Sequence, residues 1–471
     1  MANILTAVDN STYEVLEKKD KLGKMIPYKL GAGGQGAAFK VKSIATNGEC
    51  VAKLYHTETP PEFNKNLQTL TQQPSPHEAF VWPQKLLKPR SNGAIGFIMD
   101  LYDNKVYKAF PDVAIYGKAS FASRQVMLNA LIELVSAFEA LHAAGLCFQD
   151  LNEGAVVFDV EKGRVRICDC ENVVPTGVRI PMGYNARGEK IYMQGYPKYK
   201  APETEIGAML PDKYTDRYSL AVMIFMVLTR CHPLEGKKRF SFNSEGVVDA
   251  NVEKDIYGKN PIFVYDDTNM TNRPDPEADQ GAIAQWPLIP DFIKDLFKKA
   301  FCQGLPVNGV YDETKKIERC NRPAEKQWRE AFAKWMDLLV PCAKCHVAFT
   351  AGLEPQTLKL ISVCPNCKNN NRYDYPRVKI IKRNSHRRTL LLIPERTIPI
   401  SAISDSNAFD PAILVLKAKR PGIHGVKNVG KNTWNCYLGK NFAVLKPGDF
   451  VKVENGMRIA FDNDYYGEIV L

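Results

Sequence analysis

The chain contains 471 residues, a length that suggests about three domains. Hydrophobic residues make up 45% and charged residues 24%, which excludes a disordered or collagen-like chain and is ordinary for a soluble globular protein. The formal net charge of +11 is a mild basic excess for this length, so no nucleic-acid partner is expected. The densest basic stretch, residues 379–388, is interpreted as a solvated strand edge or linker, with an anionic partner as the alternative.

The chain gives no sign of secretion or of a membrane span. Its first 16 residues mix polar side chains among the apolar ones, so no signal-peptide core forms. The longest apolar run, residues 220–228, is about half of the roughly 20 residues that a spanning helix needs. We therefore expect a buried helix at this run and a cytoplasmic protein.

The predicted elements of the first 170 residues are mostly strands around one helix. Residues 24–58 read as a glycine-rich hairpin with a following strand, and residues 95–102 read as another strand. Apolar positions recur at helical spacing over residues 123–144, and Gly145 ends that helix. Two short strands, at residues 155–159 and 165–168, follow it.

The rest of the chain changes character twice. Helical patterns dominate residues 216–335, broken by a polar insertion near residues 237–282, so a small β-rich lobe is followed by a larger helical lobe. Residues 342–367 carry two cysteine pairs. Beyond about residue 375, five short apolar stretches separated by turn signals predict an all-β sandwich. These stretches are residues 389–393, 413–416, 441–445, 457–461 and 468–471.

A glycine-rich loop and a lysine form the first group of candidate functional residues. Gly31, Gly33, Gly34 and Gly36 can bring backbone amides close to phosphate oxygens, although a purely structural turn would explain them as well. The chain continues as a strand after them, which favours a strand–turn–strand loop over a dinucleotide fold. Lys53 follows on an apolar strand, where an ammonium needs a partner such as a phosphate. The alternative is a surface lysine on an edge strand.

Two carboxylates form the second group. Asp150 lies just after the helix that ends at Gly145, and Asp169 ends a strand nineteen residues later. Phosphoryl transfer needs one carboxylate to orient the substrate hydroxyl and one to hold magnesium. Taken singly, either aspartate is as well explained as a turn or cap residue.

Three further motifs accompany the glycine-rich loop, the lysine and the two aspartates along the chain. They are the hinge-like Met99-Asp100-Leu101, the motif Ala201-Pro202-Glu203 and the later Arg322-Pro323. From about residue 25 to residue 338 the sequence resembles the protein-kinase superfamily. In that family the arginine at the position of Arg322 pairs with the glutamate at the position of Glu203.

The resemblance implies a role for each candidate residue. The glycines would form a lid over the phosphates of ATP, and Lys53 would hold the α- and β-phosphates. Asp150 would be the catalytic base or would orient the substrate hydroxyl, and Asp169 would be the main magnesium ligand. Met99 and Leu101 would line the nucleotide site, and Asp216 would brace the catalytic loop, unless Asp216 simply caps its own helix.

Three phrases narrow the resemblance to a bacterial branch of serine/threonine kinases. They are residues 148–154, 232–236 and 257–261. This branch is encoded in tellurite-resistance-associated clusters beside von Willebrand-type and PP2C-type phosphatase proteins. The resemblance therefore implies serine/threonine of protein substrates as the acceptor and those two proteins as candidate partners.

The sequence departs from the family pattern at several positions. Gln149 replaces the arginine before the catalytic aspartate, which predicts activity that does not require phosphorylation of the activation loop. Ala155 replaces the second magnesium-binding asparagine; Asn152 could serve instead, or could bond Asp150 or the nearby backbone. The glutamate that pairs with the lysine is unclear, and Glu62 and Glu78 are the candidates.

The segment after Asp169 is also unusual. Asp169 is followed by Cys170-Glu171 in place of Phe-Gly, so the metal-binding carboxylate remains but the flexible glycine is lost. These departures keep a nucleotide-binding pseudokinase scaffold as the alternative to an active kinase. A small-molecule phosphotransferase is disfavoured, because such enzymes generally lack the Ala-Pro-Glu segment.

The two cysteine pairs predict a zinc site. Cys342 and Cys345 are separated by eighteen residues from Cys364 and Cys367, and two Cys-x-x-Cys knuckles at this spacing can surround one zinc ion. Four thiolates complete the coordination shell, so the metal would be structural. The alternative is two disulfides, which a cytoplasmic thiol pool disfavours.

The last hundred residues weakly resemble a forkhead-associated domain, a β-sandwich that binds phosphothreonine peptides. The resemblance rests on residues 425–428, 431–434, 446–449 and 457–461. The phosphate-gripping residues of that family have no evident counterpart, so a structural or partner-docking sandwich is favoured over a phosphopeptide reader. Trp434 is predicted to lie in the core.

The predicted fold class is α+β and multidomain. A bilobal kinase-like domain occupies residues 1–340, with a small lobe at about 20–102 and a large lobe at about 103–340. A zinc ribbon at residues 341–372 and the β-sandwich at residues 376–471 follow. The predicted function is ATP- and magnesium-dependent phosphorylation of proteins in bacterial signalling.

Overall fold

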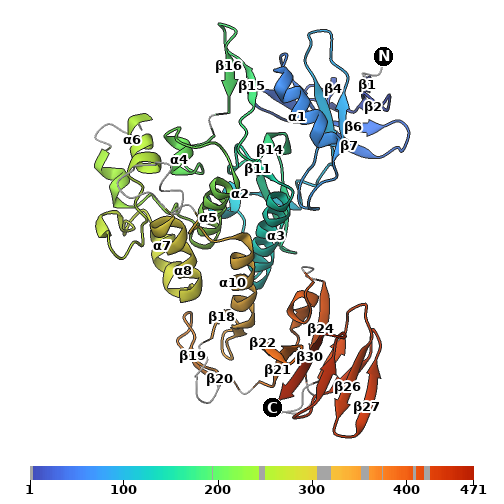
Figure 1. The fold of residues 1–471 in the computed structure, drawn as a ribbon, viewed down its shortest axis with the longest axis vertical. Helices are drawn as coiled ribbons and strands as arrows, with labels where there is room; N and C mark the ends of the chain where they lie inside the picture. Colours follow the sequence, from blue (N-terminus) through green and yellow to red (C-terminus); the bar gives the residue numbers. More distant parts are fainter. Residues whose placement is uncertain are drawn as a thin grey trace. The chain divides into compact units, whose positions relative to one another are not determined.

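The computed structural model describes eight stretches of the chain, drawn as coloured ribbon in Figure 1. They are residues 4–193, 195–242, 250–304, 320–351, 360–373, 375–406, 410–417 and 425–471. The chain divides into two compact units: unit 1 is Met1–Ala122 with Ala130–Arg329, and unit 2 is Ser123–Asn129 with Glu330–Leu471. Each unit is described by itself.

Unit 1 begins with a seven-stranded antiparallel sheet in the order β1-β2-β6-β7-β9-β8, with β5 paired to β6. The long hairpin of β6 and β7 turns at Asn47, which has the left-handed backbone (φ 62°) that asparagine tolerates. Val41 of β6 and Val51 and Ala52 of β7 are buried. The strands are β1 Ile4–Thr6, β2 Thr12–Val15, β5 Lys29–Ala32, β6 Gly36–Ser43, β7 Glu49–Tyr55, β8 Lys85–Leu87 and β9 Gly96–Met99, with a separate hairpin of β3 Glu17–Lys19 and β4 Met25–Pro27.

Helix α1 (Pro61–Gln72) packs against this sheet. Proline at its first position suits a helix start, because that residue donates no intrahelical hydrogen bond. Its buried face carries Phe63, Leu67 and Leu70, and the ring of Phe63 meets Tyr55 of β7 edge to face at 5.3 Å. Helix α1 therefore supplies apolar packing to the wall that also carries Lys53.

The helical part of unit 1 is built on α5 (Lys213–Thr229) and on α3 (Arg124–Ala143), of which the residues from Ala130 onward belong to this unit. Residues 220–228 lie inside α5 and are all buried, as the sequence predicts. Asp212 caps α5 in a capping box with Thr215, so the alternative that Asp216 is the helix cap is wrong. Among the described residues, α3 is the one helix that is long and apolar enough to cross a membrane, and just over half of its apolar window is buried inside the protein.

Short elements connect these helices and place the loops of the site. Strands β12 and β13 form the hairpin that leads into Asp169, and β11 pairs with β14. The strands are β10 Tyr107–Ala109, β11 Leu146–Phe148, β12 Val156–Asp159, β13 Arg164–Ile167, β14 Val173–Pro175, β15 Pro181–Tyr184 and β16 Lys190–Tyr192. The helices are α2 Phe110–Ala114, α4 Pro202–Glu205, α6 Ala250–Lys254, α7 Gln280–Gln285, α8 Asp291–Lys298 and α10 Glu325–Asp337.

Unit 2 is β-rich. Two small hairpins, β17 Leu339–Pro341 with β18 Ala348–Thr350 and β19 Leu360–Val363 with β20 Asn370–Tyr373, carry the cysteine pairs. A six-stranded sheet (β22-β21-β30-β29-β26-β27) and a four-stranded sheet (β23-β24-β25-β28) then share one apolar core. The core includes Trp434, as predicted. The strands are β21 Arg377–Lys382, β22 Ser385–Leu391, β23 Thr397–Pro399, β24 Pro411–Leu416, β25 Gly425–Asn428, β26 Trp434–Leu438, β27 Asn441–Leu445, β28 Phe450–Lys452, β29 Arg458–Ala460 and β30 Tyr465–Val470.

Candidate active site

A cleft of about 1090 Å³ lies in unit 1 and gathers most of the residues that the sequence singles out. Its walls come from the glycine-rich loop, strand β7, the segment after β9, and the loops after β11 and β13. The predicted residues that line it are Gly31, Gly33, Gly34, Gly36, Lys53, Met99, Leu101, Asp150 and Asp169. Asn152 is not among the lining residues.

The four glycines of the loop differ in what requires them. A Cβ on Gly36 would stand 2.5 Å from the carbonyl oxygen of Leu54, so close packing of β6 on β7 demands glycine there. A Cβ on Gly31, Gly33 or Gly34 would meet no atom within 4 Å, and none of these three has a left-handed backbone. Packing against the protein therefore does not explain these three glycines. The space beside them is open, so a ligand can approach their backbone closely.

Lys53 contacts two carboxylates at the floor of the cleft. Its Nζ lies 2.8 Å from Oδ1 of Asp169, and it also forms a short ion pair with Oε1 of Glu171. Burial alone would lower the pKa of Lys53, but the charges of Glu171 and then Asp169 outweigh burial and raise it. Lys53 is therefore a charged ammonium at neutral pH, and its side chain keeps 19% of its surface exposed toward the cleft.

Asp169 has an uncommon backbone conformation. Its φ of 54° and ψ of 35° place it in the left-handed region, and the 3-10 turn Cys170–Asn172 follows. Such conformations cost free energy in non-glycine residues and cluster at functional sites. The turn directs the carboxylates of both Asp169 and Glu171 at the same ammonium.

Neither glutamate proposed from the sequence reaches Lys53. Glu62, on α1, forms an ion pair with Lys190, and Glu78 pairs with Arg164 at 2.8 Å. Glu171 contacts Lys53 instead. The sequence analysis did not identify this residue. The available signal was a charged residue directly after Cys170, in a short polar stretch bounded by the apolar strands at residues 165–168 and 173–174.

Asp150 lies at the base of the cleft. Burial raises the pKa of its carboxyl above the ordinary value. Within the described part of the chain, its Oδ1 is buried without a hydrogen-bond partner. A buried oxygen of this kind is a free acceptor, and a raised pKa brings a carboxylate closer to the range that suits proton transfer.

The amide of Asn152 is engaged within its own loop. Its Oδ1 accepts a hydrogen bond from the backbone N–H of Gly154 at 2.8 Å, and its Nδ2 donates to the carbonyl of Asp150 at 3.4 Å. This arrangement agrees with the alternative that Asn152 stabilises the loop, while its magnesium role stays a prediction. Ala155 is fully buried and offers no ligand atom.

The loop that carries Asp150 is held from below and from the side. The backbone N–H of Phe148 donates to Oδ2 of Asp216 at 2.9 Å, and Nε2 of His142 contacts the same oxygen at 3.0 Å. Burial alone would lower the pKa of His142, but its hydrogen bonds to Asp216 and Glu325 raise it to about 9. Gln149 accepts a hydrogen bond from the backbone N–H of Ile180 at 2.8 Å, which ties the loop to the segment that follows Asp169.

The Ala201-Pro202-Glu203 segment is anchored by the predicted partner. Arg322 donates two hydrogen bonds to the carboxylate of Glu203, at 2.6 and 2.8 Å, and both side chains are fully buried. The prediction that Glu203 pairs with Arg322 is confirmed. Such a bidentate pair holds the Ala201-Pro202-Glu203 segment against Arg322.

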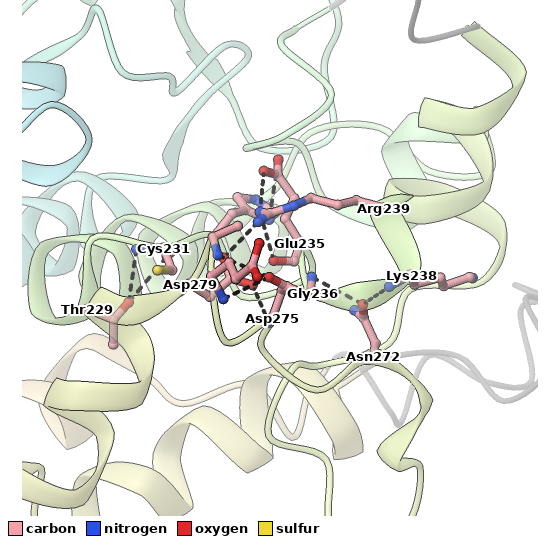
Figure 2. Close-up of polar contacts among 12 residues, drawn as sticks. Thr229, Cys231, Glu235, Gly236, Lys238, Arg239, Asn272, Asp275 and Asp279 are labelled. Atoms are coloured by element: carbon pink, nitrogen blue, oxygen red, sulfur yellow. Dashed lines mark hydrogen bonds and ion pairs between the residues drawn. The ribbon is translucent and has the colours of Figure 1, made fainter. Parts of the chain in front are cut away.

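A second polar network holds the residues just before the Ala201-Pro202-Glu203 motif. Its link to them is Lys198, whose Nζ lies 2.8 Å from Oε1 of Glu235. Figure 2 shows the network behind Glu235: Arg239 reaches toward Glu235 and donates to Asp279 at 2.9 Å. In the same view, Oδ1 of Asn272 accepts two backbone N–H groups of the turn after Glu235, at 3.1 and 3.0 Å. This region contains one of the phrases on which the bacterial resemblance rests, and in the structure it supports the segment that leads into the Ala-Pro-Glu motif.

The four predicted cysteine ligands meet in unit 2. Their Sγ atoms all lie within 4.8 Å of one another, with Cys342 to Cys367 at 3.5 Å and Cys345 to Cys364 at 3.6 Å. All four are free thiols, so the alternative of two disulfides does not hold in this structure. A tetrahedral zinc–thiolate centre with bonds of about 2.3 Å separates its sulfurs by about 3.8 Å, which these positions fit.

Comparison with known proteins agrees with the geometry of the cleft. A family model described as the protein kinase domain matches residues 26–303, which is more than half of the chain. No curated protein matches the chain. The match covers the glycine-rich loop, Lys53, Asp150, Asp169 and the Ala-Pro-Glu motif, and the chain belongs to the protein kinase family.

Proposed function

We propose that this protein is an active kinase that transfers the γ-phosphate of ATP to serine or threonine hydroxyls of protein substrates in bacterial signalling. Kinase-family membership implies phosphotransfer with ATP and Mg²⁺. The observation that carries the proposal is the convergence of Lys53, Asp150 and Asp169 on one cleft. The preference for serine and threonine over tyrosine rests on the resemblance to the bacterial branch.

Each candidate residue has a separate role in the proposed reaction. Lys53 presents an ammonium to the phosphates, and the glycine-rich loop leaves its backbone open to them. Asp169 would hold the magnesium ion, which would supply positive charge to the phosphate groups of ATP. Asp150 accepts the hydroxyl proton while the new O–P bond forms and the bond between the γ-phosphorus and the β-phosphate oxygen breaks.

The experiment is transfer of labelled γ-phosphate from ATP with Mg²⁺ or Mn²⁺, using a generic basic protein and the enzyme itself as acceptors. Wild type should label serine or threonine, and Asp150→Ala and Asp169→Ala should each lower the rate by roughly 10²–10⁴-fold. Glu253→Ala, an exchange at a residue outside the cleft, serves as the matched control and should keep the rate. A wild type that binds ATP but transfers no label would favour the pseudokinase scaffold, which recruits partners through its C-terminal part.

The four-cysteine cluster is proposed to hold a structural zinc ion in a zinc ribbon. Its support is the donor set of four mutually close thiols and the fit of their separations to a tetrahedral centre. Removal of zinc by a strong chelator, followed by dialysis into excess Mg²⁺, should unfold the β17–β20 hairpins while phosphoryl transfer continues. Equal loss of transfer and of zinc would contradict a purely structural metal that serves unit 2.

The two C-terminal sheets are proposed to form a sandwich of the forkhead-associated kind with a structural or docking role. The shared apolar core between the six-stranded and four-stranded sheets supports this interpretation. Candidate partners, by the resemblance, are a PP2C-type phosphatase and a von Willebrand-type protein.

A further inference from the structure

The lysine of the nucleotide cleft takes its partners from an unexpected place. Both carboxylates that contact Lys53 belong to the short segment after β13, at positions 169 and 171. Helix α1 contains one acidic residue, Glu62, which is exposed and pairs with Lys190 on β16. The helix beside the cleft therefore has no further carboxylate to offer the lysine.

The two carboxylates differ in exposure, and this difference separates their roles. The side chain of Asp169 is 40% exposed in the cleft, whereas that of Glu171 is 2% exposed. A buried carboxylate without a cation is costly, which favours the contact of Glu171 with Lys53. Asp169 has an exposed oxygen surface and can turn to a metal ion without leaving Lys53 unpaired.

The surroundings of Glu171 hold it in place. Tyr55, two residues after Lys53 on the same strand, is buried against it; burial and then the charge of Glu171 raise the pKa of the Tyr55 hydroxyl. Helix α1 contacts this segment through Asn66, whose Nδ2 donates to the carbonyl of Val173 at 2.8 Å. The contact is to backbone and is separate from the Lys53–Glu171 pair.

We propose that Glu171 is the positioning residue for Lys53, so that the lysine is aligned by the metal-binding segment and not by helix α1. The inference rests on the proposed function, since its importance lies in holding Lys53 toward the phosphates of ATP. The segment after β13 then fixes the positions of both the Lys53 ammonium and the metal-binding carboxylate of Asp169. A shift of α1 alone does not release Lys53.

The test is a double-mutant cycle on Lys53→Met and Glu171→Gln, with Glu62→Gln as the matched control. Affinity for ATP, measured by calorimetry with Mg²⁺, comes first, and steady-state transfer follows. Glu171→Gln should weaken ATP binding about tenfold and lower kcat/KM by roughly 10- to 100-fold, the range for residues that orient a functional group. Glu62→Gln should match wild type in both measurements.

The cycle separates positioning from simple structural damage. If Glu171 acts through Lys53, adding Glu171→Gln to Lys53→Met should cause no further loss of ATP affinity. Glu171→Asp, which keeps the charge on a shorter side chain, should fall between wild type and Glu171→Gln. Thermal unfolding of each variant shows which ones are folded and can be compared.

Two results would overturn the inference. One is wild-type ATP affinity and rate in a folded Glu171→Gln protein, and the other is additive losses in the cycle. If wild type transfers no phosphate, the proposed catalytic function fails, but the binding arm still decides whether Glu171 positions Lys53.

Discussion

Two ion pairs in unit 1 join residues at almost the same sequence separation, yet one is fully buried and the other faces the cleft. Lys53 and Glu171 are 118 residues apart, and Glu203 and Arg322 are 119 apart. Both members of the Glu203–Arg322 pair are fully buried and share two hydrogen bonds. Lys53, in contrast, keeps part of its surface in the cleft.

The difference shows how one type of interaction serves structure in one place and ligand binding in another. Arg322 also donates to the carbonyls of Gly304 and Tyr214, and its side chain is fully buried, so no ligand can reach it. The ammonium of Lys53 contacts two carboxylates, and one of them, Asp169, is itself exposed in the cleft. Negative phosphate oxygens can therefore approach Lys53 while Glu171 remains behind it.

Breaking the structural pair should have the largest effect on stability. Arg322→Met leaves the Glu203 carboxylate buried without a cation, and losing one partner of a buried pair costs about 3–5 kcal/mol. Urea unfolding of the variant should show a matching loss in the transition of the kinase domain. Arg329→Met is the matched control, because the Arg329–Glu139 pair is partly exposed at 17% and 34% and should cost about 0–1 kcal/mol. Similar small losses in both variants would contradict the assignment of the Glu203–Arg322 pair as a structural anchor.

The same two pairs show what the sequence can and cannot reveal. The pairing of Glu203 with Arg322 is predictable, because each residue lies in a short motif of fixed composition. Lys53 is also recognisable, since a charge on an apolar strand needs a partner. The same argument applies to Glu171, which lies between Cys170 and Asn172 in a segment that is buried in the structure. Its role is missed because the family pattern places the partner of the lysine on a following helix, where Glu62 lies.

The fold shows a similar division. Periodicity and turn signals predict the helix at residues 123–144 and the five C-terminal strand stretches, and each has an observed counterpart. The order of the C-terminal sheets is not predictable in this way, because it depends on long-range pairing such as that of β21 with β30. The cap of α5 is ambiguous in the sequence for a local reason: Asp212 and Thr215 form the capping box, one turn before Asp216.

A third charged group in unit 1, His142, differs from both ion pairs because its charge changes with pH. His142 lies between Asp216 and Glu325, and Glu325 also binds Arg217 at 2.7 Å. A rise in the pKa of His142 from 6.5 in the unfolded chain to about 9 in the folded protein corresponds to about 3 kcal/mol. Because the folded-state pKa is the higher one, this stabilisation is complete below pH 6.5 and is lost as the pH rises through 9.

The measurement is the free energy of unfolding from urea titrations between about pH 6 and pH 9.5. Wild type should lose about 3 kcal/mol over this interval relative to His142→Gln, which keeps a hydrogen-bond donor but carries no charge. Parallel curves for the two proteins would show that folding does not raise the pKa of His142.

The smallest predicted effect concerns a neutral contact at a position where charge would be expected. Gln149 replaces the arginine that would bind a phosphorylated activation loop, and its side chain instead accepts the backbone N–H of Ile180. Gln149→Ala should leave that N–H unpaired and loosen the segment by about 1 kcal/mol, which speeds hydrogen exchange at Ile180 roughly fivefold. Asn185→Ala, in the exposed turn between β15 and β16, is the control and should not change exchange at Ile180.

Because the Gln149 contact needs no phosphate, wild type treated with a phosphatase should keep its rate of transfer. A phosphatase-treated enzyme that becomes inert, with Ile180 already exchanging fast, would show that the segment depends on phosphate after all.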